Sequence, residues 1–178
     1  AQRTAAARHE GAASRTLGRS GTLGGHRVLG GPSNAMQMSA GVRVDDASAG
    51  RSHVIATGGV GLTGGVRARD LKVQLQPLQV ATLAGAGVKL PLSGTVSGDA
   101  VVSGTPREGW NVRGDLTHVD YDARSRVIGN GRYQTIGKRI LADATLQPLS
   151  LVTVGRFAPS AQLRGSVSGK VHAEGTTR

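Results

Sequence analysis

The sequence contains the same pattern twice, and this internal repeat limits how the chain can fold more than any other feature. The tetrapeptide Leu-Gln-Pro-Leu at 75–78 returns at 146–149, an offset of 71 residues. Without any gap, twelve of the 31 positions in 75–105 are identical to those in 146–176. A unit of this length that recurs in tandem is typical of architectures in which each copy folds in the same way beside its neighbour.

A second match lies upstream of the first. Residues 51–55 (Arg-Ser-His-Val-Ile) resemble 124–128 (Arg-Ser-Arg-Val-Ile) at an offset of 73, so a two-residue gap separates the two matches. We therefore divide the chain into three parts. These are a segment at 1–40, a first β repeat at 41–108 and a second β repeat at 109–178.

Apolar and polar residues alternate in short runs within both repeats. Leu71, Val73 and Leu75 are one example, and each run is bounded by Gly, Ser, Asp or Pro. A period of two broken by turn residues predicts antiparallel strands. The stretches at 78–84 and 149–157 lack this alternation, and the second of them allows a short helix. We expect an all-β fold, mainly an antiparallel meander made of two repeats, with one or two short helices.

Glycine, asparagine and proline indicate where the strands turn or end. We predict a tight turn at Gly129-Asn130-Gly131, because Asn and Gly accept positive φ. The Ser-Gly pairs at 97–98 and 168–169 are predicted to form the hairpin turn between the two strands that close each repeat. Pro77 is expected to end its strand, because proline has no N–H group to donate.

Residues 1–40 differ from the repeats in composition. They are mostly Ala, Gly, Ser, Arg and Thr, and no period is sustained among their few large apolar residues. Such a segment buries too little apolar surface to offset its ordering entropy. We predict a disordered basic arm that orders against a partner. The chain has a formal charge of +11, which attracts phosphate groups, and the candidate docking residues are Arg3, Arg8, Arg15, Arg19 and Arg27.

The sequence offers little support for catalysis. Residues 59–64 match G-x-G-x-x-G, but 66–69 alternate like a strand, so a glycine-rich turn is the favoured interpretation. His118, Asp120 and Asp122 share one face of a strand and suit a divalent ion, but a polar solvent-facing surface is favoured. Cysteine is absent, as are nucleophile-elbow and P-loop motifs. We expect no enzyme activity, no cofactor and no metal.

Nucleic acid is not an expected partner despite the positive charge. Proteins that bind single strands interleave aromatic side chains with basic ones, because bases stack on the rings. Aromatic residues make up 2% of this chain, and none lies in 1–40.

The repeated pattern resembles the repeated C-terminal region of the AsmA/TamB superfamily of bacterial envelope proteins. It consists of Leu-x-Pro-Leu, then Leu-(Arg/Ser)-Gly-(Ser/Thr)-Val-Ser-Gly and a closing Gly-Thr, and 139–176 carries it best. The resemblance covers about 41–178. It implies a long, curved, open β sheet with a hydrophobic inner groove. Such relatives lie in the periplasm and are implicated in phospholipid movement between membranes or in outer-membrane protein assembly.

The resemblance transfers no catalytic residue, but it predicts which side chains face the groove. The resemblance and the alternation together select seven residues as candidates for the groove and core. They are Val73, Leu75, Leu92, Val96, Leu146, Leu163 and Val167.

Two functions are compatible with these features. We expect the chain to differ from that family in two ways, by lacking the N-terminal anchor and by being short. About a dozen strands at roughly 4.8 Å spacing give a sheet only about 60 Å wide. We therefore expect a non-enzymatic structural or assembly subunit, periplasmic and peripheral to a membrane. It would dock on integral membrane proteins of a larger complex through its β edges and basic arm. The alternative is a lipid-binding β-groove module of an AsmA/TamB-like phospholipid transport or outer-membrane assembly protein, with anionic phospholipid as candidate ligand.

Overall fold

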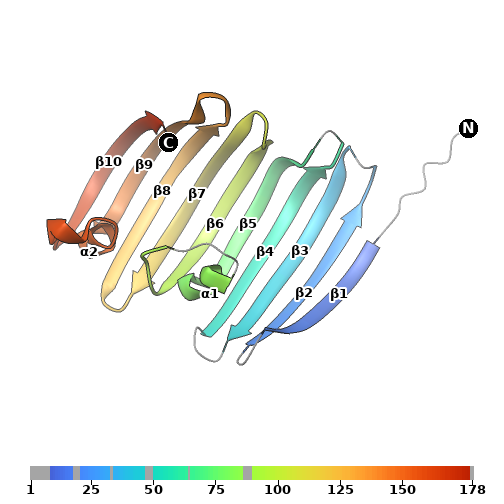
Figure 1. The fold of residues 1–178 in the computed structure, drawn as a ribbon, viewed down its shortest axis with the longest axis horizontal. Coiled ribbons are helices and arrows are strands. Elements are labelled where there is room, and N and C mark those ends of the chain that lie inside the picture. The colour runs from blue at the N-terminus through green and yellow to red at the C-terminus, as the bar shows by residue number, and fades with distance from the viewer. Residues whose placement is uncertain are drawn as a thin grey trace, which may run out of the picture.

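A computed structural model describes residues 9–17, 21–32, 34–46, 50–63, 65–85 and 90–176 of the chain. Its strands form one antiparallel sheet, and their order in space is their order along the chain (Figure 1). The strands are β1 (His9–Leu17), β2 (Gly21–Gly30), β3 (Met36–Asp46), β4 (Gly50–Gly61), β5 (Arg67–Gln79), β6 (Thr95–Thr105), β7 (Gly109–Asp120), β8 (Ala123–Gln134), β9 (Arg139–Ser150) and β10 (Ser166–Thr176).

Two short α-helices interrupt the meander. Helix α1 (Val80–Gly85) follows β5, and α2 (Leu151–Gly155) follows β9. Single 3₁₀ turns lie at Ile136–Lys138 and Pro159–Ala161. The predicted all-β antiparallel meander with short helices is therefore confirmed.

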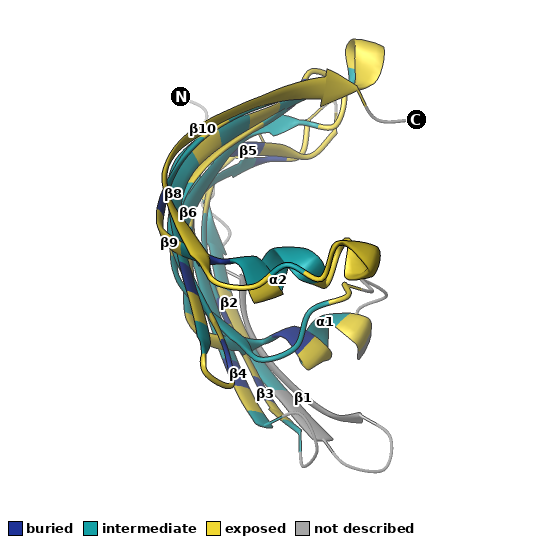
Figure 2. Cartoon of the chain, turned by 90° about the vertical axis from the view of Figure 1, so that its left-hand side faces the viewer, coloured by how far each residue is buried: buried dark blue, intermediate teal, exposed yellow. Residues whose placement is uncertain are grey.

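The sheet is strongly curved, and both helices lie on its concave side (Figure 2). We call the concave side the inner face and the convex side the outer face. The register assigns residues to each face, because directly paired residues of neighbouring strands point the same way. Ser52 touches α1, so Val44 opposite it, and Val54 and Ala56 further along β4, belong to the inner face.

Among the described residues, the two helices are the only regular α-helices or strands that lie against a face of the sheet (Figure 2). Among the described residues, the buried apolar side chains are those of Val44, Ala68, Val80 and Leu146. Val80 is the first residue of α1, and the other three lie in strands. The fold therefore rests on strand pairing to an unusual degree, since a domain normally packs two layers around a core.

The two sequence repeats occupy equivalent positions in the sheet. Val54 pairs with Leu75 in the first, and Val127 pairs with Leu146 in the second. The two-residue gap lies beyond these pairs. Strand β5 bulges at Asp70, which has φ 46°, and the turn after β4 is one residue longer than the turn after β8. The division of the chain at 108/109 remains a prediction.

The structure differs from the sequence prediction over much of 1–40. It places 9–17 and 21–30 in strands β1 and β2 and begins β3 at Met36. The ladder from β2 to β3 runs without a break from the pair Gly21 and Asp46 to the pair Gly30 and Gln37. Backbone groups alone make these hydrogen bonds, so the strands form without the large apolar side chains that the composition argument required.

The prediction of a tight turn at Gly129-Asn130-Gly131 is wrong. These residues lie within β8 and pair with both β7 and β9. A Cβ atom at Gly129 would overlap the backbone carbonyl of Asp143 in β9. The glycine is needed there for close approach of two strands rather than for a reversal of the chain.

The turns predicted at the Ser-Gly pairs are also wrong. Residues 97–98 lie inside the continuous strand β6, and 168–169 lie inside β10. In both strands the pairing shifts at this point, and Gly98 and Gly169 have φ 128° and 146°. Each glycine therefore forms part of a β-bulge. Strand β5 likewise continues through Pro77, which occupies the opposite side of the same irregularity, between Leu75 and Leu78.

Close packing at Gly129 predicts a specific effect of substitution. Gly129→Ala should lower the free energy of unfolding by about 1–3 kcal/mol, because the added methyl group must displace a neighbouring strand. Gly131→Ala is the matched control, since a Cβ atom there would lie 3.8 Å from the carbonyl oxygen of Leu141. Urea unfolding followed by circular dichroism measures both. Equal stability of the two variants would contradict the assignment.

Candidate functional site

A row of small side chains crosses the inner face from β3 to β10. Each member is paired directly with the next, so the row runs at right angles to the strands. It consists of Ala40, Ala56, Val73, Ala100, Gly114, Gly129, Ala144 and Val171. We call it the small-residue row. Because its side chains are short, the inner face is deepest along this line.

Larger apolar side chains flank this row on both sides. Toward the helices, a second line of paired residues contains Val42, Val54, Leu75, Gly98, Leu116, Val127 and Leu146. Toward the other rim lie Leu71, Val102 and Val112, and beyond them the directly paired Trp110 and Tyr133. We call the resulting hollow the inner trough.

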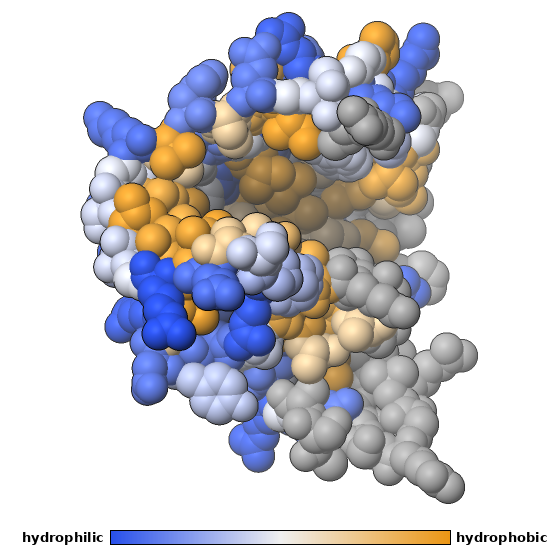
Figure 3. Space-filling model, turned by 60° about the vertical axis from the view of Figure 1, so that its left-hand side comes forward, coloured by the Kyte–Doolittle hydropathy of each residue, from blue (hydrophilic) through white to orange (hydrophobic). Residues whose placement is uncertain are grey.

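The inner trough is apolar and open. Figure 3 shows hydrophobic residues gathered in the hollow and hydrophilic residues along its rims. Several of its valine and isoleucine side chains stay exposed, including Val112 at 40% and Val171 at 45%. An exposed apolar surface that extends across a whole sheet is rare on a protein that acts alone, so it indicates a binding surface.

The dimensions of the trough suit long, thin ligands. Seven strand spacings separate β3 from β10, which at about 4.8 Å each give a length of about 34 Å. The hydrocarbon core of a bilayer is about 30 Å thick and holds two opposed layers of acyl chains, so one chain spans about 15 Å. The small-residue row could therefore accommodate about two acyl chains end to end.

The structure brings most of the predicted groove residues to this face. Val73 lies in the small-residue row, Leu75 and Leu146 lie in the line beside it, and Val96 and Val167 lie at its helix side. Leu92 and Leu163 belong instead to the connections that follow the helices. Leu163 lies beside Gly155 at the end of α2.

Each helix is attached to the inner face by one serine. The Ser52 Oγ accepts a hydrogen bond from the Gln79 N–H at 3.0 Å and lies 2.9 Å from the Thr82 Oγ1. In the second repeat, the Ser125 Oγ accepts from the Ser150 N–H at 3.0 Å and lies 3.2 Å from the Thr153 Oγ1. Both serines are 2% exposed.

These anchors hold the helices along one rim of the trough. A second pair of equivalent bonds supports them, because the Val80 N–H donates to Gly94 and the Leu151 N–H donates to Gly165, both at 2.9 Å. Sequence reasoning found the matching serines only as repeat identities and gave them no role. The sequence did contain a signal for this role, because each serine recurs together with a threonine in the apolar stretch that follows.

A buried carboxylate joins the two helical regions. The Asp120 Oδ2 accepts a hydrogen bond from the Ser93 Oγ at 2.7 Å and contacts the Arg156 guanidinium at 3.2 Å. Ser93 lies just before β6, and Arg156 lies just after α2. His118 Nε2 lies 2.7 Å from the Ser93 carbonyl oxygen. This network makes Asp120 a structural link between the repeats.

The candidate metal set does not assemble. His118 and Asp120 are engaged as described, and Asp122 lies in the turn after β7. Within the described ranges, no group of three His, Cys, Asp or Glu side chains is placed to hold an ion. The glycine motif at 59–64 runs from β4 into a turn, and its described continuation is strand β5 rather than a helix.

The outer face is charged, and its ion pairs run across neighbouring strands. The Arg126 guanidinium contacts Asp115 at 2.6 Å, and Arg51 contacts Asp45 at 3.4 Å. The hydrogen bonds from Arg126 lower the pKa of the Asp115 carboxyl below its ordinary value. The two faces of the sheet therefore have opposite character, and the outer face is suited to water.

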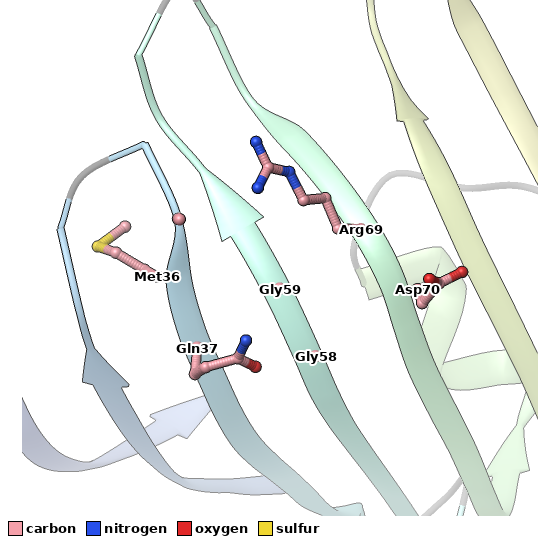
Figure 4. A pocket seen from close by; sticks show the side chains of 7 residues that line it. Met36, Gln37, Gly58, Gly59, Arg69 and Asp70 are labelled. Carbon is pink, nitrogen blue, oxygen red and sulfur yellow. The ribbon is translucent and has the colours of Figure 1, made fainter.

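Several cavities open on the outer face. One of about 360 Å³ lies where β3, β4 and β5 come together near the β5 bulge (Figure 4). Met36, Gln37 and Arg69 are among its lining residues, and the glycines of β4 form part of it (Figure 4). It presents no paired acid and base and no nucleophile, so it offers no evident chemistry.

Two of the five candidate arm residues lie in described strands, and three do not. Arg15 lies in β1 and Arg27 in β2. Arg27 is paired with Ala40, so it extends the small-residue row with an exposed cation. Arg3, Arg8 and Arg19 lie outside the described residues.

Comparisons with protein-family models, with curated proteins and with solved structures find no match to this chain. The described part of the chain also contains no helix long and apolar enough to cross a membrane.

The serine anchors predict a measurable loss of stability. Ser125→Ala should cost about 1–3 kcal/mol of unfolding free energy, because the buried Ser150 N–H is left without a partner. Hydrogen exchange should show faster exchange at the Ser150 amide. Ser160→Ala, at an exposed position of the last 3₁₀ turn, is the control. Unchanged exchange at Ser150 would contradict the role of the anchor.

The outer-face pair of His172 and Asp143 predicts a pH effect. The His172 Nδ1 lies 2.7 Å from the Asp143 carboxylate, and this hydrogen bond raises the pKa of His172 above the ordinary 6.5. The pair therefore stabilises the fold below that value, and its contribution is lost as pH rises through the raised pKa. NMR titration should show His172 returning toward 6.5 in Asp143→Asn. A titration unchanged by that substitution would exclude the pair in solution.

Proposed function

We propose that the inner trough binds the acyl chains of phospholipids, which makes the chain a lipid-binding β-groove module of the AsmA/TamB-like type. The observation that carries the proposal is the small-residue row, a continuous apolar line that crosses eight strands and is flanked by larger apolar side chains. The module acts by sheltering hydrocarbon from water and not by catalysis.

The thermodynamic reason lies in the missing second layer. Burial of apolar surface contributes roughly 25 cal/mol for each Å² removed from water. A sheet that leaves its apolar face open forgoes this contribution, and an acyl chain lying along the trough restores it. Methylene groups present no hydrogen-bonding demand, so the absence of polar groups along the small-residue row suits them.

The rims of the trough suit anionic headgroups. Exposed arginines lie at the strand ends and turns on both sides, and the net charge of the chain is +11. They include Arg67, Arg107, Arg124 and Arg164. A phospholipid whose tail occupies the trough would therefore place its phosphate near cations.

Native mass spectrometry and lipid transfer test this function. The chain is incubated with vesicles of phosphatidylcholine and phosphatidylglycerol and then separated from them. We expect phospholipid to remain bound. Ala100→Trp should abolish this binding, because the indole ring fills the small-residue row without adding charge.

Val101→Trp is the matched control for this test. Val101 is adjacent on β6 and faces the outer side, so the same ring leaves the trough open and binding should persist. Lipid binding that is equal in the two variants would refute the trough as the site. Circular dichroism of both variants checks that the sheet is intact.

A second candidate function is a structural role in a membrane-associated complex. The open sheet supports it, because the outer edges of β1 and β10 carry no neighbouring strand within the described residues. Such edges seek pairing. Co-purification in fixed ratio with integral membrane proteins and without lipid would favour this function over lipid binding.

A further inference from the structure

Strand β10 is an edge of the described sheet, but its sequence is built like that of an interior strand. Its residues Ser166–Thr176 correspond one for one to Thr95–Thr105 of β6 at the repeat offset of 71. Strand β6 has a neighbour on each side, whereas β10 pairs with β9 alone among the described strands. All eleven residues of β10 are exposed.

Three glycines show that this edge has room for another strand. In β6 and just before it, a Cβ atom at Gly94, Gly98 or Gly104 would overlap a backbone carbonyl of β7. These glycines let β7 approach closely.

The same three glycines recur at the edge of β10, where the described chain has no neighbouring strand. Their counterparts in the second repeat are Gly165, Gly169 and Gly175, and a Cβ atom at any of them meets nothing within 4 Å. Gly165 and Gly169 also have positive φ, but Gly175 does not. Nothing in the described chain therefore requires glycine at 175, whereas a strand packed against the β10 edge would.

The sequence of β10 is complementary to itself. Two identical antiparallel strands related by a two-fold axis pair around one central residue. With His172 at the centre, Lys170 lies opposite Glu174 of the other copy, and this ion pair forms twice. Val171 then lies opposite Ala173, and Gly169 lies opposite Gly175. Centring the pair on Val171 instead would place Lys170 opposite His172.

We propose that two copies of this chain pair antiparallel through β10, in the register centred on His172. Glu174 already contacts Arg139 of β9, so in the pair its carboxylate lies between two cations. A closed two-fold pair also explains how a long exposed edge avoids open-ended association.

The pairing would join the two troughs. A two-fold axis perpendicular to the sheet keeps the inner face of one copy continuous with that of the other. The two troughs, each crossing the eight strands from β3 to β10, would then form one trough about 72 Å long at about 4.8 Å per strand. The pairing does not depend on whether the trough carries lipid, so the two proposals can fail separately.

Engineered cysteines test both the contact and the register, because the natural chain has no cysteine. In the proposed register, His172→Cys places two thiols directly opposite each other, at the Cα separation of about 4.5–5.5 Å that a disulfide requires. Under mild oxidation this variant should become a covalent dimer. Lys170→Cys alone should not, but mixed with Glu174→Cys it should form a heterodisulfide.

Two outcomes of the cysteine experiment would overturn the proposal. Failure of His172→Cys to cross-link at concentrations where the mass is that of two chains would exclude β10 as the contact. Equal cross-linking by Lys170→Cys alone would exclude the register.

Sedimentation equilibrium of the unmodified chain gives an independent measure. We expect a species of twice 18.2 kDa that dissociates on dilution. Lys170→Glu should weaken it by on the order of tenfold, because two attractive cross-strand pairs become repulsive, and adding Glu174→Lys should restore it. Lys72→Glu, an exposed outer-face change on interior strand β5, should have no effect.

Other masses would decide against the pair. A monomer at every concentration, or a mass that grows without limit as concentration rises, would exclude a closed two-fold pair. A dimer that is indifferent to Lys170→Glu would assign the contact to another surface.

Discussion

Hydrogen bonding between consecutive strands is the interaction on which everything else in this protein depends. Within the described part of the chain, few apolar side chains are buried and no second sheet packs against the first. Each strand is held by the one before it and the one after it, as in repeat proteins whose stability comes from neighbouring units. The side chains are thereby free to give the two faces different tasks, a charged face toward water and an apolar face toward a ligand.

The sequence predicted the general architecture well, because its main signals are local. Alternation at Leu71, Val73 and Leu75 indicated a strand, and the interrupted alternation after Leu-Gln-Pro-Leu marked the places where α1 and α2 form. The repeat was visible as identical residues. Ser52 and Ser125 were found in the same way, but their roles as anchors depend on which segment folds over which strand, and that information is not local.

The errors also have a common physical origin. Glycine satisfies two different needs, a positive φ and the close approach of another backbone, and only the neighbouring strands distinguish them. At Gly129 the second need decides, and at Gly98 both apply within a continuous strand. The interpretation of 1–40 did not predict β1 and β2, for a related reason. Composition measures what side chains can bury, whereas β1 and β2 are placed by backbone pairing on an existing edge.

The order of the strands has a consequence for how the chain reaches its native state. Because spatial order equals chain order from β1 to β10, no strand waits for a distant partner, and loop closure between neighbours costs little entropy. Folding of β proteins is slow when distant segments must meet first. This sheet can instead grow by one hairpin at a time from whichever segment forms first, so a partly synthesised chain already contains correctly paired strands, with its newest edge as the template for the next.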